Sequence, residues 1–188
     1  MIKLKRLLQS PFTLHAGVLK RIDRETKHAQ AGKPARIVAK MNALNEPQVI
    51  RALYQASQAG VQIDLIVRGA CTLRPGVPGV SDNIRVRSIV GRFLEHHRVY
   101  WFANDGDPDL FCSSADWLER NLLRRVETAF PLIDPVLSAR VFDEALANYL
   151  ADNVRAWELH SDGNYQRLQA ADSPPHSAQA ALLGKIGG

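Results

Sequence analysis

The stretch ARIVAKMNALNEPQVIRALYQASQAGVQIDLIVRG (residues 35–69) decides the fold class of this chain. Its two ends, residues 35–41 and 61–67, are short apolar runs with the length and composition of strands. Between them Asn45 is placed to cap a helix, and Gly60 is placed to end it. Two short strands joined by a capped helix usually lie parallel, so this unit predicts an α/β domain.

Predicted elements on both sides extend this unit into a mixed β-sheet flanked by helices. Residues 84–90 alternate in polarity, as a half-buried strand does. Turn-rich segments between short apolar runs predict two hairpins, and apolar periodicity with capping residues predicts three helices. The hairpins cover residues 99–112 and 154–168, and the helices cover 10–29, 117–123 (capped by Asp116) and 134–150 (opened by Asp134 and Pro135). In the last helix we expect the core to receive Val136, Leu137, Val141, Leu146 and Leu150.

Changes in composition predict three segments. Residues 27–34 are polar and end in Gly and Pro, which favours a boundary there. Beyond residue 170 the chain is rich in Ala, Ser, Pro and Gly, so we expect residues 171–188 to be a disordered tail. The predicted segments are therefore 1–34, 35–170 and 171–188.

The composition restricts the class of partner. The chain has 188 residues, 46% of them hydrophobic and 23% charged, which is typical of a globular domain with its own core. Its 24 basic and 19 acidic residues give a net charge of +5, which favours an anionic partner. Zinc-finger spacing and clustered His and Cys ligands are absent from the sequence, so we expect neither nucleic acid as a partner nor a metal site made by this chain alone. A P-loop is absent as well, so a nucleotide would not be held as in P-loop enzymes.

Three basic residues next to predicted strands, His96, Arg98 and Arg68, are the best candidates for a site. His96 and Arg98 lie two residues apart, so on a strand their side chains would project to the same face, while His97 would point away. A guanidinium beside an imidazole suits a phosphoryl group, because Arg binds the oxygens and His exchanges a proton. Arg68 ends a buried strand directly before Gly69, and ligands gather at the carboxyl ends of such strands.

Further candidates each have a structural alternative. Arg74 lies in a Leu-Arg-Pro-Gly turn and Lys40 lies near the end of the first predicted strand; each is either a phosphate contact or a solvated side chain. Ser114 is either a hydroxyl for a phosphoryl group or a helix cap. Basic side chains that would line a path for a polyanion are Arg92, Arg98, Arg120, Arg124 and Arg125, although the last three also fit a solvated helix face.

Three segments in order resemble the C-terminal catalytic domain of bacterial polyphosphate kinase of the phosphohistidine-dependent type. They are VRGACTLRPG (67–76), EHHRVY (95–100) and SSADW (113–117). His96-x-Arg98 is also similar to the His-x-Lys half-motif of the phospholipase D superfamily, with Arg in place of Lys. The third segment departs from the Gly-Ser-x-Asn element of that superfamily, having Ser for Gly and Asp for Asn. The resemblance implies a phospholipase D-like layered domain with a mixed β-sheet.

The resemblance also implies an activity. The terminal phosphoryl group of ATP would pass reversibly to inorganic polyphosphate through a phosphohistidine in a preceding domain, of which residues 1–34 would be the last helix and linker. Arg68 and His96 would contact nucleotide phosphates, with His96 as the assisting catalytic imidazole, and magnesium would be bound mostly outside this chain. Implied partners are ATP, ADP, polyphosphate, the upstream domains and further copies of the enzyme, in the cytoplasm or peripheral to the inner membrane.

Two alternatives from other classes remain open at this stage. One is a phospholipase D-like phosphodiesterase that dimerises to combine two His96 half-sites, which would need His96 as a nucleophile. The other is a polyanion-binding module without chemistry, in which His96 would be dispensable and binding would be sensitive to salt.

Overall fold

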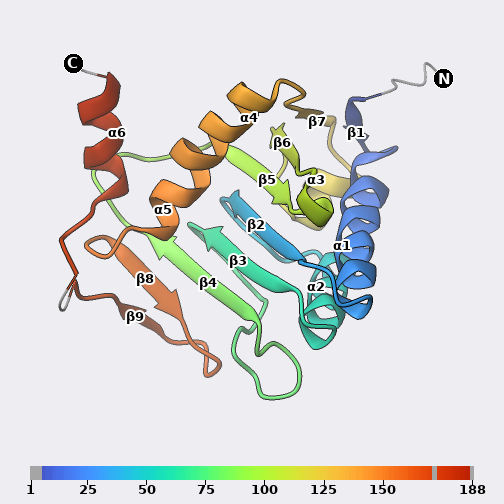
Figure 1. Ribbon diagram of the computed structural model, residues 1–188, viewed down its shortest axis with the longest axis horizontal. Coiled ribbons are helices and arrows are strands. Elements are labelled where there is room, and N and C mark those ends of the chain that lie inside the picture. The colour runs from blue at the N-terminus through green and yellow to red at the C-terminus, as the bar shows by residue number, and fades with distance from the viewer. Residues whose placement is uncertain (1–5, 171–172, 187–188) are drawn as a thin grey trace.

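The computed structural model describes residues 6–170 and 173–186. Within them the strands form one mixed sheet in the order β1-β7-β6-β5-β2-β3-β4-β8-β9 (Figure 1). The strands are β1 (Leu8–Ser10), β2 (Arg36–Met41), β3 (Gln62–Val67), β4 (Ile84–Ile89), β5 (Arg98–Phe102), β6 (Asp109–Ser113), β7 (Glu127–Pro131), β8 (Ala156–Leu159) and β9 (Tyr165–Arg167). The helices are α1 (Leu14–Gln30), α2 (Pro47–Gln58), α3 (Glu119–Leu123), α4 (Pro135–Phe142), α5 (Asn148–Leu150) and α6 (Ala178–Ile186), with a 3₁₀ turn at Asn104–Gly106 and a π-helical turn at Asp143–Ala147.

The centre of the sheet is the predicted strand–helix–strand unit. β2 pairs parallel with β3, and β3 pairs parallel with β4, whereas the remaining pairs are antiparallel. The cap of α2 differs from the prediction, because Glu46 rather than Asn45 accepts the hydrogen bond from the Val49 amide, at 2.7 Å. Pro47 then occupies the first helical turn, where its missing N–H is not needed.

Alternating side chains of the central strands build two hydrophobic cores, one on each face of the sheet. In β2, Ile37, Ala39 and Met41 enter the core that α1 and α2 cover. Val38 faces the other core, which the helical segment α4–α5 and the start of α6 cover (Figure 1). This is the period-two alternation of a strand buried on both sides. Among the described residues, no helix combines the length and the apolar character needed to cross a bilayer.

The first predicted segment boundary does not separate two cores. β1 pairs antiparallel with β7, and α1 buries Leu14, Val18 and Ile22 in the same core as β2. The polar residues before β2 form a tight turn between a helix and a strand, in which Gly32 has φ +71°. The described part of segment 1–34 thus packs as part of this domain.

The helix that begins at Pro135 starts where the sequence predicted, but not all of the side chains predicted to be buried are buried. Asp134 caps α4 by accepting from the Leu137 amide at 2.9 Å. Val136 and Leu137 are nevertheless 78% and 45% exposed, contrary to the prediction, whereas Leu146 is fully buried. Leu137 precedes Leu146 by nine residues, which is two and a half turns of a regular α-helix, so these two side chains could not share one face.

The predicted disordered tail is wrong for residues 178–186, which form α6. Ala178 is fully buried, and its amide donates to Asp152 Oδ2 at 2.8 Å. The Asn148 side-chain amide donates to the Ala178 carbonyl at 3.0 Å. Composition alone missed this helix because buried tertiary contacts hold its first turn.

Candidate functional site

Residues that are far apart in the sequence come together where the central parallel strands end. We call this end of the sheet its carboxyl edge. The parallel strands β2 and β3 end at Met41 and Val67, so Asn42 and Arg68 follow them at the same edge. β5 runs antiparallel to β2, and Arg98 at its start lies opposite Ser113 at the end of β6. The carboxyl edge of an α/β sheet is the usual place for a ligand site.

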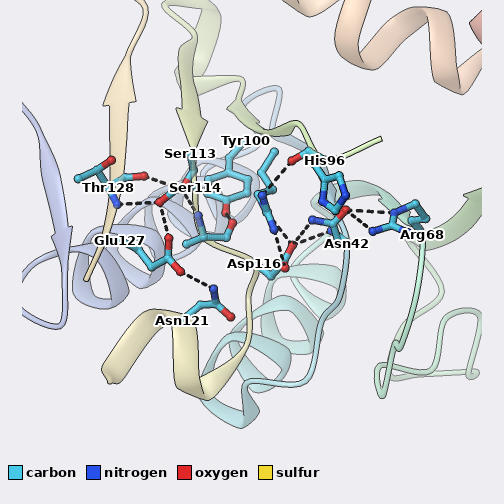
Figure 2. Close-up of polar contacts among 12 residues, drawn as sticks. Asn42, Arg68, His96, Tyr100, Ser113, Ser114, Asp116, Asn121, Glu127 and Thr128 are labelled. Atoms are coloured by element: carbon cyan, nitrogen blue, oxygen red, sulfur yellow. Dashed lines mark hydrogen bonds and ion pairs between the residues drawn. The ribbon is translucent and has the colours of Figure 1, made fainter. Parts of the chain in front are cut away.

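Asp116 is the centre of a polar network at this edge (Figure 2). Its Oδ1 accepts from the Asn42 amide at 2.7 Å, from Asn42 Nδ2 at 3.1 Å and from Arg98 Nε at 3.0 Å, and its Oδ2 accepts from Arg98 Nη2 at 3.1 Å. Asp116 is only 6% exposed. The predicted cap role is wrong, because α3 begins at Glu119 without a side-chain cap. Asp116 instead joins the end of β2 to the start of β5.

Arg98 turns inward rather than toward a ligand. Besides the two bonds to Asp116, its Nη1 donates to the His96 carbonyl at 2.9 Å. The hydrogen bonds to Asp116 raise the pKa of Arg98, so the guanidinium stays charged. The structure therefore does not support the prediction that Arg98 contacts phosphate. Its side chain instead binds Asp116 and the loop before β5.

Arg68 is anchored to the same network through Asn42. Its Nε and Nη2 both donate to Asn42 Oδ1, at 3.1 and 3.0 Å, which orients the plane of the guanidinium. Its Nη1 has no hydrogen-bond partner among the described residues. The next residue, Gly69, passes so close to β2 that an added Cβ would lie 2.9 Å from the Asn42 carbonyl oxygen. Arg68 is thus a half-buried, oriented cation with donor capacity to spare.

His96 lies in the loop before β5 and is exposed. His96 and Arg98 do not share one face of a strand as predicted, because β5 begins only at Arg98. Figure 2 shows that His96 joins the network through its backbone carbonyl, which accepts from Arg98 Nη1. The backbone of His96 is thus held at the start of β5 by a contact that the strand pattern did not predict.

His97 packs on the face of the sheet that α5 covers, pointing away from the site as the sequence predicted. Its ring centroid lies 5.4 Å from that of Tyr149, in the core that α5 covers. Burial, together with the nearby Lys40 charge, lowers the pKa of His97 to about 4. A neutral, packed imidazole is a structural group rather than a partner for phosphate.

Lys40 lies on that face too, not at the site. Its Nζ donates to Glu95 Oε2 at 2.7 Å and lies 4.5 Å from the centroid of the Tyr149 ring. The side chain is 5% exposed, and burial lowers its pKa. Lys40 is therefore unavailable to an anion at the sheet edge, and the expectation of a phosphate contact does not hold.

Arg74 is exposed in a separate segment, where the Tyr54 hydroxyl accepts from the Arg74 backbone amide at 2.8 Å.

The two serines bind the neighbouring strand β7. Ser113 Oγ donates to the Thr128 carbonyl at 2.9 Å and accepts from the Ala115 amide. Ser114 Oγ donates to a Glu127 carboxylate oxygen and accepts from the Thr128 amide at 3.1 Å. Neither hydroxyl caps α3. These bonds fix the turn that presents Asp116, while Ser114 itself remains exposed.

A cavity of about 470 Å³ adjoins the same edge. It lies between the segments that follow β2 and β3 and the short helix α3. Its lining residues are Ala43, Asn45, Ala70, Leu118, Glu119, Arg120 and Arg124. Arg124 is paired with Glu119 at 2.6 Å, and Arg120 and Arg124 are both exposed. The cavity is an open groove with two basic side chains, and it reaches Ala70, two residues after Arg68.

Comparison with known proteins gives one consistent family. The family model "Polyphosphate kinase C-terminal domain 2" matches residues 7–179. Polyphosphate kinase of Xylella fastidiosa (strain 9a5c) is 73% identical over 183 residues, which are 97% of this chain and 26% of that protein. The crystal structure of polyphosphate kinase from Porphyromonas gingivalis is 40% identical with a TM-score of 0.94, covering 98% of this chain and 28% of the other. This chain thus spans about a quarter of the length of the relatives it matches.

A more distant likeness concerns the fold alone. Nuc, a phospholipase D family member from Salmonella typhimurium, has a TM-score of 0.52 at 15% identity, covering 73% of this chain and 88% of Nuc. The mixed sheet with helices on both faces is therefore a phospholipase D-like fold, as the sequence predicted.

Proposed function

Because this chain belongs to the polyphosphate kinase C-terminal domain 2 family, we propose that it supplies one side of the phosphoryl-transfer site of a longer polyphosphate kinase. The proposed reaction is the reversible transfer of the terminal phosphoryl group of ATP to inorganic polyphosphate. One observation carries the proposal: an oriented arginine, Arg68, and the backbone carbonyl of an exposed histidine, His96, are tied to one polar network at the carboxyl edge of the sheet.

Arg68 is suited to bind phosphate oxygens. Asn42 uses one side of its guanidinium fork and leaves Nη1 for an oxygen of the ligand. Because the fork is already oriented, little reorganisation is needed when charge develops on the transferring phosphoryl group. Arg68 is therefore proposed as an ATP- and phosphate-binding residue that stabilises the transition state.

His96 is proposed as the assisting imidazole. It is exposed at the end of a loop held by Arg98, so it can donate a hydrogen bond or a proton to a phosphate oxygen. The histidine that is itself phosphorylated is expected in the preceding domain of the longer enzyme. His96 thus transfers protons and orients phosphate rather than forming the phosphoenzyme.

A magnesium ion does not fit the described residues of this chain. Residues 6–170 and 173–186 hold no group of three or more His, Cys, Asp or Glu side chains placed to bind a metal. The carboxylate at the site, Asp116, already uses both oxygens for Arg98 and Asn42. Oxygen ligands for magnesium would have to come from elsewhere in the longer enzyme and from ATP.

The groove that reaches Ala70 is proposed as part of the path for polyphosphate. Arg120 and Arg124 line it, and Arg125 and Arg92 are exposed. Arg98, the remaining member of the predicted path, is paired with Asp116 and is left out.

The phosphodiesterase alternative also loses support, because Arg98 occupies the position of the motif lysine and faces inward. We further propose that the longer enzyme is a homo-oligomer that acts in the cytoplasm or peripheral to the inner membrane.

We expect this chain by itself to make no polyphosphate from ATP, because the phosphorylated histidine lies outside it. It should bind polyphosphate weakly, with an affinity that falls as the salt concentration rises. Incubation with γ-labelled ATP followed by electrophoresis of the polymer, together with binding titrations at two salt concentrations, measures both. Robust synthesis of polymer by the isolated chain would show that the proposed division of the site is wrong.

We expect Arg68→Lys in the longer enzyme to lower kcat/KM for ATP by ~10-fold or more. Lysine keeps the charge but loses the planar fork that Asn42 orients, and hydrogen bonds to charged groups contribute about 1.5–3 kcal/mol. Steady-state kinetics with varied ATP measures the loss. Arg51→Lys is the matched control, since Arg51 is exposed on α2 and is not a candidate for the site. Equal kinetics for Arg68→Lys and the parent enzyme would remove Arg68 from the proposed site.

A further inference from the structure

The loop that carries His96 has little structure of its own. It connects the end of β4 at Ile89 with the start of β5 at Arg98. Residues 90–94 and His96 are exposed. A loop of this kind samples many conformations unless other parts of the molecule restrain it. Precise placement of His96 therefore needs contacts from outside the loop.

Gln179, in the first turn of α6, makes such contacts. Its Oε1 accepts from the Phe93 amide at 3.0 Å, and its Nε2 donates to the Phe93 carbonyl at 2.9 Å. The side-chain amide thereby satisfies both backbone groups of one loop residue, as a neighbouring strand would. Gln179 is only 7% exposed, so water competes little for these bonds.

Gly91 provides independent evidence of how closely the loop and Gln179 approach. A Cβ added at Gly91 would lie 2.2 Å from Gln179 Oε1, 2.6 Å from Cδ and 3.0 Å from Nε2. The three nearest atoms all belong to Gln179, and Gly91 does not have the positive φ that would itself require glycine. The absence of a side chain at Gly91 is thus explained by the amide of Gln179.

Glu95 extends the restraint to the residue next to His96. Gln179 Nε2 also donates to Glu95 Oε1 at 3.0 Å, and Tyr149 Oη donates to the same oxygen at 2.6 Å. Lys40 Nζ holds the second carboxylate oxygen at 2.7 Å. The start of α6 is itself fixed by Asp152. The loop is therefore tied to buried groups of β2, α5 and α6.

We propose that Gln179 is a positioning residue that clamps residues 91–95 and thereby sets the place of His96 in phosphoryl transfer. The inference rests on the proposed role of His96. It assigns to α6 a function in the reaction: the helix holds one loop of the site in the arrangement that the transition state needs.

In the complete enzyme, Gln179→Ala should lower kcat about 10-fold, because small displacements of a catalytic group are costly. The KM for ATP should change much less, since the lost alignment matters mainly in the transition state. Hydrogen exchange of a peptide covering residues 90–97 should become faster, because the Phe93 amide loses its acceptor. Gln166→Ala, at an exposed glutamine of β9, is the matched control and should change none of these.

The double variant gives the sharpest test. Gly91→Ala alone should also lower kcat, because the new methyl group meets the amide of Gln179. In Gly91→Ala/Gln179→Ala the nearest clashing atoms are gone, so its kcat should match that of Gln179→Ala alone. Multiplied losses in the double variant would overturn the proposal, since independent sites combine in that way. Gly91→Ala tests the same contact from the other side if Gln179→Ala folds poorly.

Including His96→Ala in the series separates the two hypotheses. A fully active His96→Ala enzyme would overturn the proposed function and, with it, the purpose of the clamp. An impaired His96→Ala enzyme beside unchanged Gln179→Ala and Gly91→Ala enzymes would overturn the clamp alone. Loss in all three, with the double variant no worse than Gln179→Ala, is the result we expect.

Discussion

His96→Ala in the complete polyphosphate kinase is expected to lower turnover by ~10²-fold or more, the usual contribution of a positioned proton donor. The side chain is exposed, so its removal leaves no cavity in the core. The loss should therefore appear in kcat, with the midpoint of thermal unfolding almost unchanged. Initial rates of polyphosphate synthesis from ATP, and of the reverse reaction, measure it.

Two other histidines serve as controls for this prediction. His160 is exposed and far along the chain in the turn after β8, so His160→Ala should leave the rate unchanged. His97 packs on Tyr149, and burial keeps its pKa at about 4, so it is neutral at pH 7. His97→Ala should therefore affect stability more than rate. Equal rate losses at His96 and His97 would indicate general destabilisation, and an unimpaired His96→Ala enzyme would exclude His96 from the mechanism.

Asp116→Ala is expected to have the largest effect on stability, lowering the free energy of unfolding by about 3–5 kcal/mol. The change leaves the Arg98 guanidinium, whose side chain is 20% exposed, without its opposite charge. It also removes the acceptor of two hydrogen bonds from Asn42. Because Asn42 orients Arg68, the activity of the complete enzyme should fall as well. Urea unfolding of this chain measures the change in free energy.

A double variant distinguishes a lost ion pair from a simple loss of packing. Arg98→Ala/Asp116→Ala removes both charges, so it should be less destabilised than the sum of the two single variants. Asp116→Asn is the conservative comparison, because it keeps the shape and loses the charge. A cost below about 0.5 kcal/mol for Asp116→Ala, the range of ordinary surface changes, would contradict the central place given to this carboxylate.

Local sequence patterns were sufficient for the centre of the fold. The apolar runs at residues 35–41 and 61–67 became the parallel pair β2–β3, and this pair alone predicts that Arg68 lies at a ligand-binding edge. The resemblance of three ordered segments predicted the family, which the comparisons confirm. The site roles of Arg68 and His96 stay predictions until the variants above are measured.

Other assignments failed where a local pattern had two physical explanations. Asp116 stands before an apolar run, where a helix cap is expected. Only the position of Arg98 in the folded chain shows that Asp116 is an ion-pair partner. Lys40 near the end of a strand fits a surface cation, and only the placement of Glu95 and Tyr149 on the face that α5 covers shows that it is buried.

The sequence by itself determined the parallel unit and the basic residues at its ends, because these depend on periodicity and on neighbours within a few positions. It did not predict β1, β7 or α6. The tertiary structure alone decided which charges are paired and which remain available. The charge of Arg98 is paired with Asp116, 18 residues away, and Gln179 binds Phe93, 86 residues away. Hydrogen bonds and ion pairs act over a few ångströms in space, so partners so distant in the chain leave no local pattern to read.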